Sequence, residues 1–219
     1  MTGANRGLGL AFARALSKRG DTVIATARQP GRARELKELP VRVVALDVSD
    51  SGSVEDLARS LSGEKLDVLI NNAAIGVAGP GIARLKTADL EQSFRVNAAG
   101  PLAVTQALLP NLRAGRRRLV VNLSSGLGSI STNDSGGWSA YRASKAALNQ
   151  LTRTLAAELA NEGFTIVAIS PGWVRTDMGG SGATLSPGES VAAMIEVLDR
   201  LKPSDTGRFF DQRGRQMPW

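Results

Sequence analysis

The sequence has 219 residues, of which 42% are hydrophobic and 21% charged, and this composition is typical of one soluble α/β domain. It contains no cysteine and no histidine, which excludes disulfides, thiolate nucleophiles, zinc sites built on thiolate or imidazole, and a Ser-His-Asp triad. The formal net charge of +7 is compatible with an anionic ligand, although we interpret it chiefly as a solvated basic surface.

Short apolar runs alternate along the chain with helical patterns. The predicted strands are Thr22–Ala27, Val41–Leu46, Leu66–Asn71, Arg118–Leu123, Phe164–Ile169 and Gly207–Phe210. The predicted helices are Gly7–Arg19, Ser53–Ser62, Ala88–Leu112, Trp138–Asn161 and Glu189–Leu201. Several strands are apolar throughout, as expected when helices cover both faces of a parallel sheet. The alternation therefore predicts a single α/β domain over residues 1–219, with a Rossmann-like, doubly wound parallel sheet.

Two segments rich in Gly, Ser, Asn and Asp, at Gly126–Gly137 and Met178–Gly188, are predicted to be loops. In doubly wound sheets the ligand site lies on such loops, at the carboxyl ends of the strands. The sequence has no apolar run of membrane-spanning length and no signal peptide, so we expect a cytoplasmic protein that is not bound to a membrane.

A glycine-rich loop, Thr2–Gly9, leads into the first predicted helix. Its glycines allow the backbone to approach a diphosphate, and the helix N-terminus adds N–H donors and a positive dipole. Such a loop normally follows a strand, yet only Met1 precedes Thr2, so the first and central strand is missing from the sequence. We expect either that the sequence begins several residues late or that the protein folds poorly and binds cofactor weakly.

An ordered set of motifs resembles those of short-chain dehydrogenases/reductases. The set comprises the Thr2–Gly9 loop, Asn71-Asn72-Ala73-Ala74, Asn97, Ser125, Tyr141-Arg142-Ala143-Ser144-Lys145 and Pro171-Gly172. The resemblance covers the whole chain except the missing first strand. The segment Pro171–Gly180 and the ending Met217-Pro218-Trp219 resemble the C-factor-like and sniffer-type carbonyl reductase branch. Ala74 departs from the family, which usually has glycine at that position.

Tyr141 is the only tyrosine, and Lys145 lies four residues later on the same face of a predicted helix. A nearby ammonium should lower the pKa of the phenol, so that Tyr141 can exchange a proton with a carbonyl oxygen while a nicotinamide carries hydride. The resemblance implies that Lys145 also holds the nicotinamide ribose, that Ser125 holds the substrate oxygen, and that Asn97 supports a water relaying protons to the lysine. Ser124 competes with Ser125, which we choose because the family uses the second serine of such a pair.

The stretch Thr26-Ala27-Arg28-Gln29 carries no acid for an adenosine ribose hydroxyl. Arg28 is available there and Arg6 could join it, and two guanidiniums suit a 2′-phosphate, so we predict NADP(H) rather than NAD(H). The residues that we expect to bind the cofactor, largely from the resemblance, are Gly3, Asn5, Arg6, Leu8, Arg28, Asp47, Val48, Asn72, Ala73, Tyr141, Lys145, Pro171, Gly172, Val174 and Thr176.

The sequence thus predicts an oxidoreductase that interconverts a small-molecule carbonyl and a secondary alcohol, without a metal. Trp138, Trp173 and residues near Met178 could form apolar walls for the substrate. The alternative is a non-catalytic, cofactor-binding or signalling protein on the same scaffold. Nucleic-acid binding is disfavoured because the basic run Arg116-Arg117-Arg118 has no interleaved aromatics. The resemblance also implies a homodimer or homotetramer.

Overall fold

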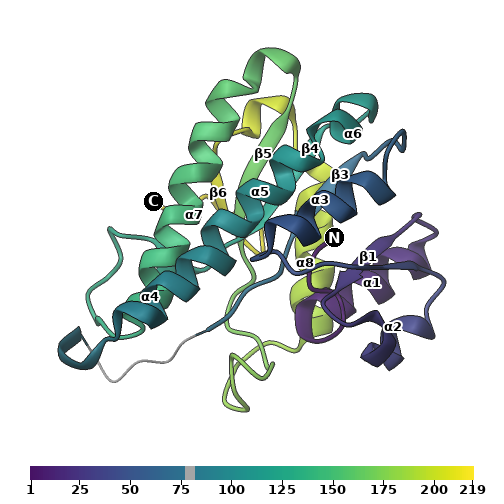
Figure 1. Cartoon of the computed structure of the whole chain (residues 1–219). Helices are drawn as coiled ribbons and strands as arrows, with labels where there is room; N and C mark the ends of the chain where they lie inside the picture. Colours follow the sequence, from purple (N-terminus) through teal and green to yellow (C-terminus); the bar gives the residue numbers. More distant parts are fainter. Residues whose placement is uncertain (77–81) are drawn as a thin grey trace.

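The structure is a computed structural model that describes residues 1–76 and 82–219 (Figure 1). Its strands are β1 Ile24–Ala27, β2 Arg42–Ala45, β3 Val68–Asn71, β4 Leu119–Leu123, β5 Thr165–Ser170 and β6 Phe209–Asp211. Its helices are α1 Gly7–Arg19, α2 Arg34–Lys37, α3 Ser51–Ser60, α4 Thr87–Phe94, α5 Gly100–Ala107, α6 Leu109–Ala114, α7 Ser139–Glu158 and α8 Pro187–Arg200. Neighbouring strands pair in parallel, which confirms the predicted Rossmann-like α/β class.

The strands form two sheets, with the orders β2-β1 and β3-β4-β5-β6. In the part of the chain that the structure describes, no strand lies between β1 and β3, as the sequence led us to expect. Residues 1–4 lie between them instead. On one side Met1 N donates to Ile24 O at 2.7 Å and Thr26 N donates to Met1 O at 3.0 Å. On the other side Thr2 N donates to Ile70 O at 2.9 Å, so these four residues join the two sheets and lead directly into the glycine-rich loop.

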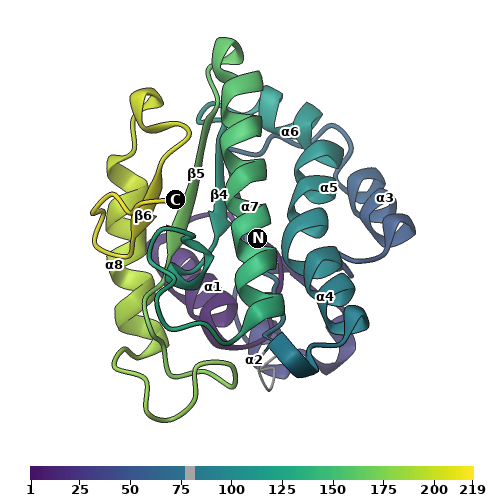
Figure 2. The ribbon, with the colours of Figure 1, turned by 90° about the vertical axis from the view of Figure 1, so that its left-hand side faces the viewer.

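Helices cover both faces of the four-stranded sheet. One face carries α1 and α8, whose buried side chains include Phe12, Val191 and Met194. The other face carries α3, α5 and α7, with Val104 and Leu155 among the buried side chains. Figure 2 shows α8 on one side of β4 and β5 and α5 on the other. Because β4 and β5 are buried along their whole length, their largely apolar sequences are explained by burial on both faces.

The predicted helix Ala88–Leu112 is wrong as a single element. A π-helical turn at Arg95–Ala99 separates α4 from α5, and a second break at Leu108 precedes Pro110, near the start of α6. The π turn contains Asn97, whose side chain is fully buried and is hydrogen-bonded outside its own helix. Tertiary hydrogen bonds of one asparagine therefore accompany the interruption of an otherwise regular helical pattern.

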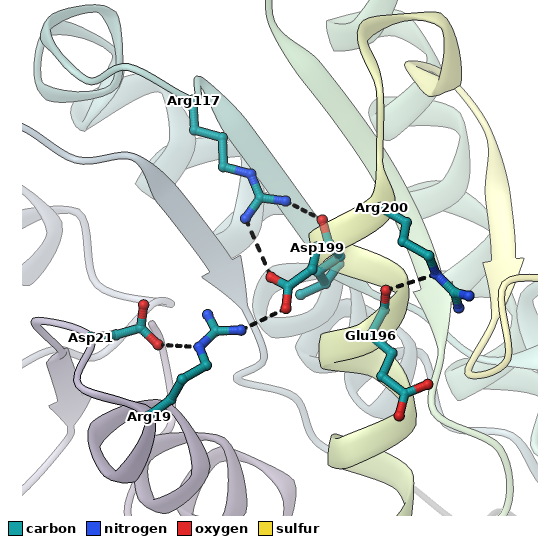
Figure 3. Close-up of polar contacts among 7 residues, drawn as sticks. Arg19, Asp21, Arg117, Glu196, Asp199 and Arg200 are labelled. Atoms are coloured by element: carbon teal, nitrogen blue, oxygen red, sulfur yellow. Dashed lines mark hydrogen bonds and ion pairs between the residues drawn. The ribbon is translucent and has the colours of Figure 1, made fainter.

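An ion network lies where α1 and α8 end (Figure 3). Arg19 bridges Asp21 at 2.6 Å and Asp199 at 2.7 Å, and Arg117 lies 3.8 Å from the other oxygen of Asp199. Arg117 also donates to the main-chain oxygen of Leu198. The network links α1 and α8 to the segment that enters β4.

Among the described residues, no helix has both the length and the apolar character needed to cross a membrane.

Candidate functional site

A cleft of about 2300 Å³ lies at the carboxyl ends of the strands. Pockets for drug-sized ligands usually measure about 300–1,000 Å³, so this cleft has room for a larger ligand together with a second, small one. The glycine-rich loop and several basic residues line one end, whereas Ser125, Tyr141 and Lys145 line the other. All of the predicted cofactor-binding residues line this cleft, together with Ser125.

The glycine-rich loop presents backbone without side chains to the cleft, and we call its glycines, Gly3, Gly7 and Gly9, the glycine cradle. Gly3 and Gly7 have φ angles of +62° and +54°, which favour glycine. A Cβ on Gly9 would lie 2.2 Å from the main-chain oxygen of Gly3, so no side chain fits there. No side chain caps the start of α1, which leaves its first N–H groups available to an anion.

The residues that follow β3 hold this loop in place. Asn72 Nδ2 donates to the main-chain oxygens of Thr2 at 2.9 Å and Gly3 at 2.8 Å. In return, Thr2 Oγ1 accepts hydrogen bonds of 3.0 Å from the backbone N–H groups of Asn72 and Ala73. The spacing between the glycine-rich loop and the β3 end is therefore fixed by side chains from both.

The Ser–Tyr–Lys set comes together at the far end of the cleft. Tyr141 and Lys145 lie one turn apart on α7, only 8% and 2% exposed, with Lys145 Nζ 5.8 Å from the centre of the tyrosine ring. Lys145 Nζ donates to the main-chain oxygen of Leu123 at 2.6 Å, and the Ser125 hydroxyl lies close enough to the Tyr141 phenol to influence its pKa. Ser124 donates instead to Asn149 at 2.6 Å, so Ser125 is the serine of the pair that meets the tyrosine.

Burial shifts the pKa values of Tyr141 and Lys145. It raises the pKa of Tyr141 above its usual value, and the nearby hydroxyl of Ser125 opposes this rise without reversing it. Burial also lowers the pKa of Lys145 to about 7. The expectation that the ammonium lowers the pKa of the phenol is therefore wrong, because burial of the phenol dominates its pKa and the desolvated amine is only about half protonated at neutral pH. The phenol is protonated at neutral pH and is ready to donate.

Asn97 lies behind the cleft rather than in it. Its Oδ1 accepts from Ile75 N at 2.8 Å, and its Nδ2 donates to Ile75 O at 2.9 Å and to Ser144 Oγ at 3.0 Å. Ser144 in turn donates to the main-chain oxygen of Tyr141 at 2.8 Å. Within the residues described, these hydrogen bonds tie the segment after β3 to the turn of α7 that carries the tyrosine, and none of them reaches Lys145.

Basic side chains gather at the other end of the cleft. Arg28 is exposed and lies near Asp47, whose pKa is lowered chiefly by the hydroxyl of Ser49 and further by the charge of Arg28. Arg6 pairs with Asp177 across the cleft, so in this structure it does not join Arg28 as expected. The sequence reasoning missed five further basic residues of the lining. Two of them are Arg95 and Arg175, and the other three are Arg14, Lys18 and Arg32.

The sequence contained a pattern that could have identified two of the last three residues, Arg14 and Lys18. Arg14 and Lys18 lie four residues apart on the first predicted helix, and this spacing places them on one face. Arg14 pairs with Glu35 in the structure. Arg32 belongs to an irregular stretch after β1 and had no such pattern.

The loop after β5 completes the cleft. Thr176 packs towards the glycine-rich loop, since a Cβ on Gly7 would lie 3.5 Å from its methyl group. Three apolar side chains proposed as substrate walls line the tyrosine end. Trp138 meets Tyr141 edge-on at 6.0 Å between ring centres, Trp173 is 57% exposed, and Met178 packs against Gly76.

Comparisons with known proteins agree with this geometry. A sequence profile described as short chain dehydrogenase matches residues 1–184. C-signal of Myxococcus xanthus is 47% identical over 154 residues, which cover 70% of this chain and 93% of that protein. The carbonyl reductase Sniffer of D. melanogaster superposes with a TM-score of 0.95 at 31% identity, over 100% of this chain and 97% of that one. An NADPH-bound carbonyl reductase from chicken fatty liver has a TM-score of 0.93 at 36% identity, with the same coverage.

Proposed function

The chain belongs to the short-chain dehydrogenase family, and from this premise we propose that it is an NADP(H)-dependent reductase that interconverts a carbonyl and a secondary alcohol. We propose further that residues 1–219 form one cofactor-binding domain and that Tyr141 is the proton donor and acceptor. The observation that carries the proposal is the meeting of Ser125, Tyr141 and Lys145 at one end of a cleft whose other end is a glycine cradle.

The residues present fit a dinucleotide. The backbone at Gly3, Gly7 and Gly9 and the uncapped start of α1 would hold the diphosphate. Asp47 and Val48 would flank the adenine, whereas Asn72 and Ala73 would line the path towards the nicotinamide. The nicotinamide side would be bounded by the loop after β5, with Pro171, Gly172, Val174 and Thr176 along the cleft.

When bound, NADPH supplies the hydride that reduces the carbonyl carbon, and NADP⁺ accepts a hydride in the reverse direction. Tyr141 gives its phenolic proton to the carbonyl oxygen, so that C=O becomes CH–OH, and takes a proton back when the alcohol is oxidised. Ser125 would hold the same oxygen beside the phenol. Lys145, once it is protonated, would stabilise the phenolate that remains.

Substitution of Tyr141 by Phe tests the proton transfer. Tyr141→Phe removes the hydroxyl and leaves the ring that packs against Trp138. We expect NADPH oxidation with a panel of aldehydes and ketones to fall by about a hundredfold or more, since general acid catalysis contributes about 10²–10⁴-fold. NADPH binding, followed by cofactor fluorescence, serves as the control and should be retained, because the other residues that line the cofactor path are unchanged. Turnover by Tyr141→Phe at the wild-type rate would refute the proposal.

The preference for NADP(H) rests on Arg28, which is exposed at the adenosine end of the cleft. The NADPH bound to the chicken carbonyl reductase supports the same choice. Arg28→Ala should weaken NADPH binding and leave NADH binding nearly unchanged, because only NADPH carries the 2′-phosphate. Arg34→Ala changes an exposed arginine outside the cleft and is the matched control. Tighter binding of NADH than of NADPH by the wild type would contradict the assignment.

The second candidate is a non-catalytic, cofactor-binding signalling protein. It is favoured by the 47% identity to a protein named C-signal. The turnover assay separates the two candidates, because NADPH binding without reduction of any carbonyl compound would support the second one.

A further inference from the structure

The segment 212–219 runs back along β6. Asp211 closes the turn, since its Oδ1 accepts from the backbone N–H groups of Arg213 and Arg215, both at 2.9 Å. Asp211 N also donates to Arg215 O at 2.9 Å. Beyond the turn, Met217 N donates to Phe209 O at 2.8 Å, so the returning segment is hydrogen-bonded to the strand. The direction of residues 216–219 is therefore set by the sheet.

Trp219 anchors this returning segment and reaches a different part of the chain. Its ring stacks on the fully buried Phe209, with 5.5 Å between ring centres and 21° between ring planes. Its main-chain oxygen accepts from Ile130 N and Ser131 N at 3.2 Å each, and from the hydroxyls of Ser129 at 3.2 Å and Ser131 at 3.1 Å. Figure 2 shows the end of the chain beside β6 and close to the coil that follows β4.

The segment that Trp219 holds joins the two halves of the proposed active site. It begins directly after Ser125 and ends at Trp138, three residues before Tyr141. Its first turn is held by Gly126 N, which donates to Ser170 Oγ at 3.1 Å, and by Asn149, which donates to Gly128 O at 3.1 Å. The contacts to Trp219 come next, at residues 129–131, so they fix the segment before it crosses to α7.

We propose that Trp219 is a positioning residue for the substrate end of the cleft, an inference that rests on the proposed reductase function. With its ring held on Phe209, its main-chain oxygen fixes residues 129–131. These residues in turn set Ser125 and Trp138 relative to Tyr141. The glycine-rich loop and Arg28 belong to elements that these contacts do not involve. The effect of Trp219 is therefore on carbonyl turnover and not on NADPH binding.

The test compares three variants of the full chain. Trp219→Ala removes the stacking ring, Trp219→Phe keeps an aromatic ring and the main-chain oxygen, and Arg213→Ala changes an exposed side chain in the same segment. Trp219→Ala should lower kcat/KM for a reducible aldehyde by about tenfold or more, because a small misplacement of reacting groups is costly. Its NADPH affinity should match the wild type. Trp219→Phe should recover most of the lost kcat/KM, and Arg213→Ala should behave as the wild type.

Amide hydrogen exchange supplies a readout that is independent of turnover. The N–H groups of Ile130 and Ser131 should exchange faster in Trp219→Ala than in Arg213→Ala, because they donate to the anchored oxygen. Equal exchange in the two variants, an unchanged kcat/KM in Trp219→Ala, or an equal loss of NADPH binding and turnover would each overturn the proposal. Absence of turnover in the wild type would defeat the proposed function instead, while the exchange experiment would still decide whether Trp219 holds the segment.

Discussion

Tyr141 and Lys145 are both buried, and burial disfavours the charged form of each side chain. Burial raises the pKa of the phenol and lowers that of the amine to about 7. An ion pair of phenolate and ammonium would need both charges to be desolvated at once. The structure therefore presents a protonated phenol, which is the form that the proposed reduction requires, beside an amine whose pKa of about 7 leaves it about half protonated at neutral pH.

The burial of the Lys145 amine predicts how the free energy of unfolding depends on pH. Between pH 7 and pH 10.5 the unfolded chain carries the Lys145 proton more often than the folded chain, so the free energy of unfolding should rise with pH in this window. Below pH 7 both states are protonated and the full cost of burying the charge remains. We expect the difference in Tm between pH 9.5 and pH 7, measured without cofactor, to be smaller in Lys145→Met than in the wild type.

Comparing the variants with the wild type cancels the contributions that other titrating groups make to the pH dependence of Tm. The buried amino group of Met1, whose pKa burial lowers to about 5, titrates in every variant and cancels in the difference. Lys65→Met changes an exposed lysine and should keep the wild-type pH dependence. An equal pH dependence in Lys145→Met and the wild type would show that Lys145 is not desolvated.

The elements could be predicted wherever one physical pattern dominates. The apolar runs of β4 and β5 and the helical pattern of α1 correspond to real strands and a real helix, because burial alone dictates them. The short α2 was missed because four residues are too few to show a period. The start of α8 was placed two residues late, although Ser186 and Glu189 form a capping box that the sequence displays. The break at Asn97 depends on partners distant in sequence and left no local signal.

The ion network around Asp199 in Figure 3 connects α1 and α8 with the segment that enters β4. Its side chains are about half exposed, so we expect Asp199→Ala to lower the free energy of unfolding by about 1 kcal/mol or less. The loss should shrink in 1 M salt, where the screening length falls to about 3 Å. Urea unfolding of Asp199→Ala and of Asp56→Ala, which loses only exposed contacts with Arg59 along α3, supplies the comparison. A loss independent of salt would assign the effect of Asp199 to packing instead.

In the part of the chain that the structure describes, the strands form two sheets, and the large cleft crosses the carboxyl ends of both. Residues 1–4 both join the sheets and deliver the glycine cradle, so the cofactor end of the cleft depends on few backbone hydrogen bonds. Ordered motifs in the sequence predicted which residues line this cleft, because strand ends of a parallel sheet meet at one edge. They could not predict the sign of the pKa shift of Tyr141, the pairing of Arg6 with Asp177, or the contact of Trp219 with residues 129–131. Each of these depends on burial or on contacts between irregular segments.

The arrangement of the whole cleft is tested most directly by a crystal structure of the protein with NADP⁺ and an unreactive carbonyl compound. We predict that the diphosphate lies against Gly3 and Gly7, and that the nicotinamide lies beside Tyr141. The carbonyl oxygen should lie within hydrogen-bonding distance of both the Tyr141 and the Ser125 hydroxyls. A nicotinamide bound away from Tyr141, or a carbonyl oxygen out of reach of its hydroxyl, would contradict the account.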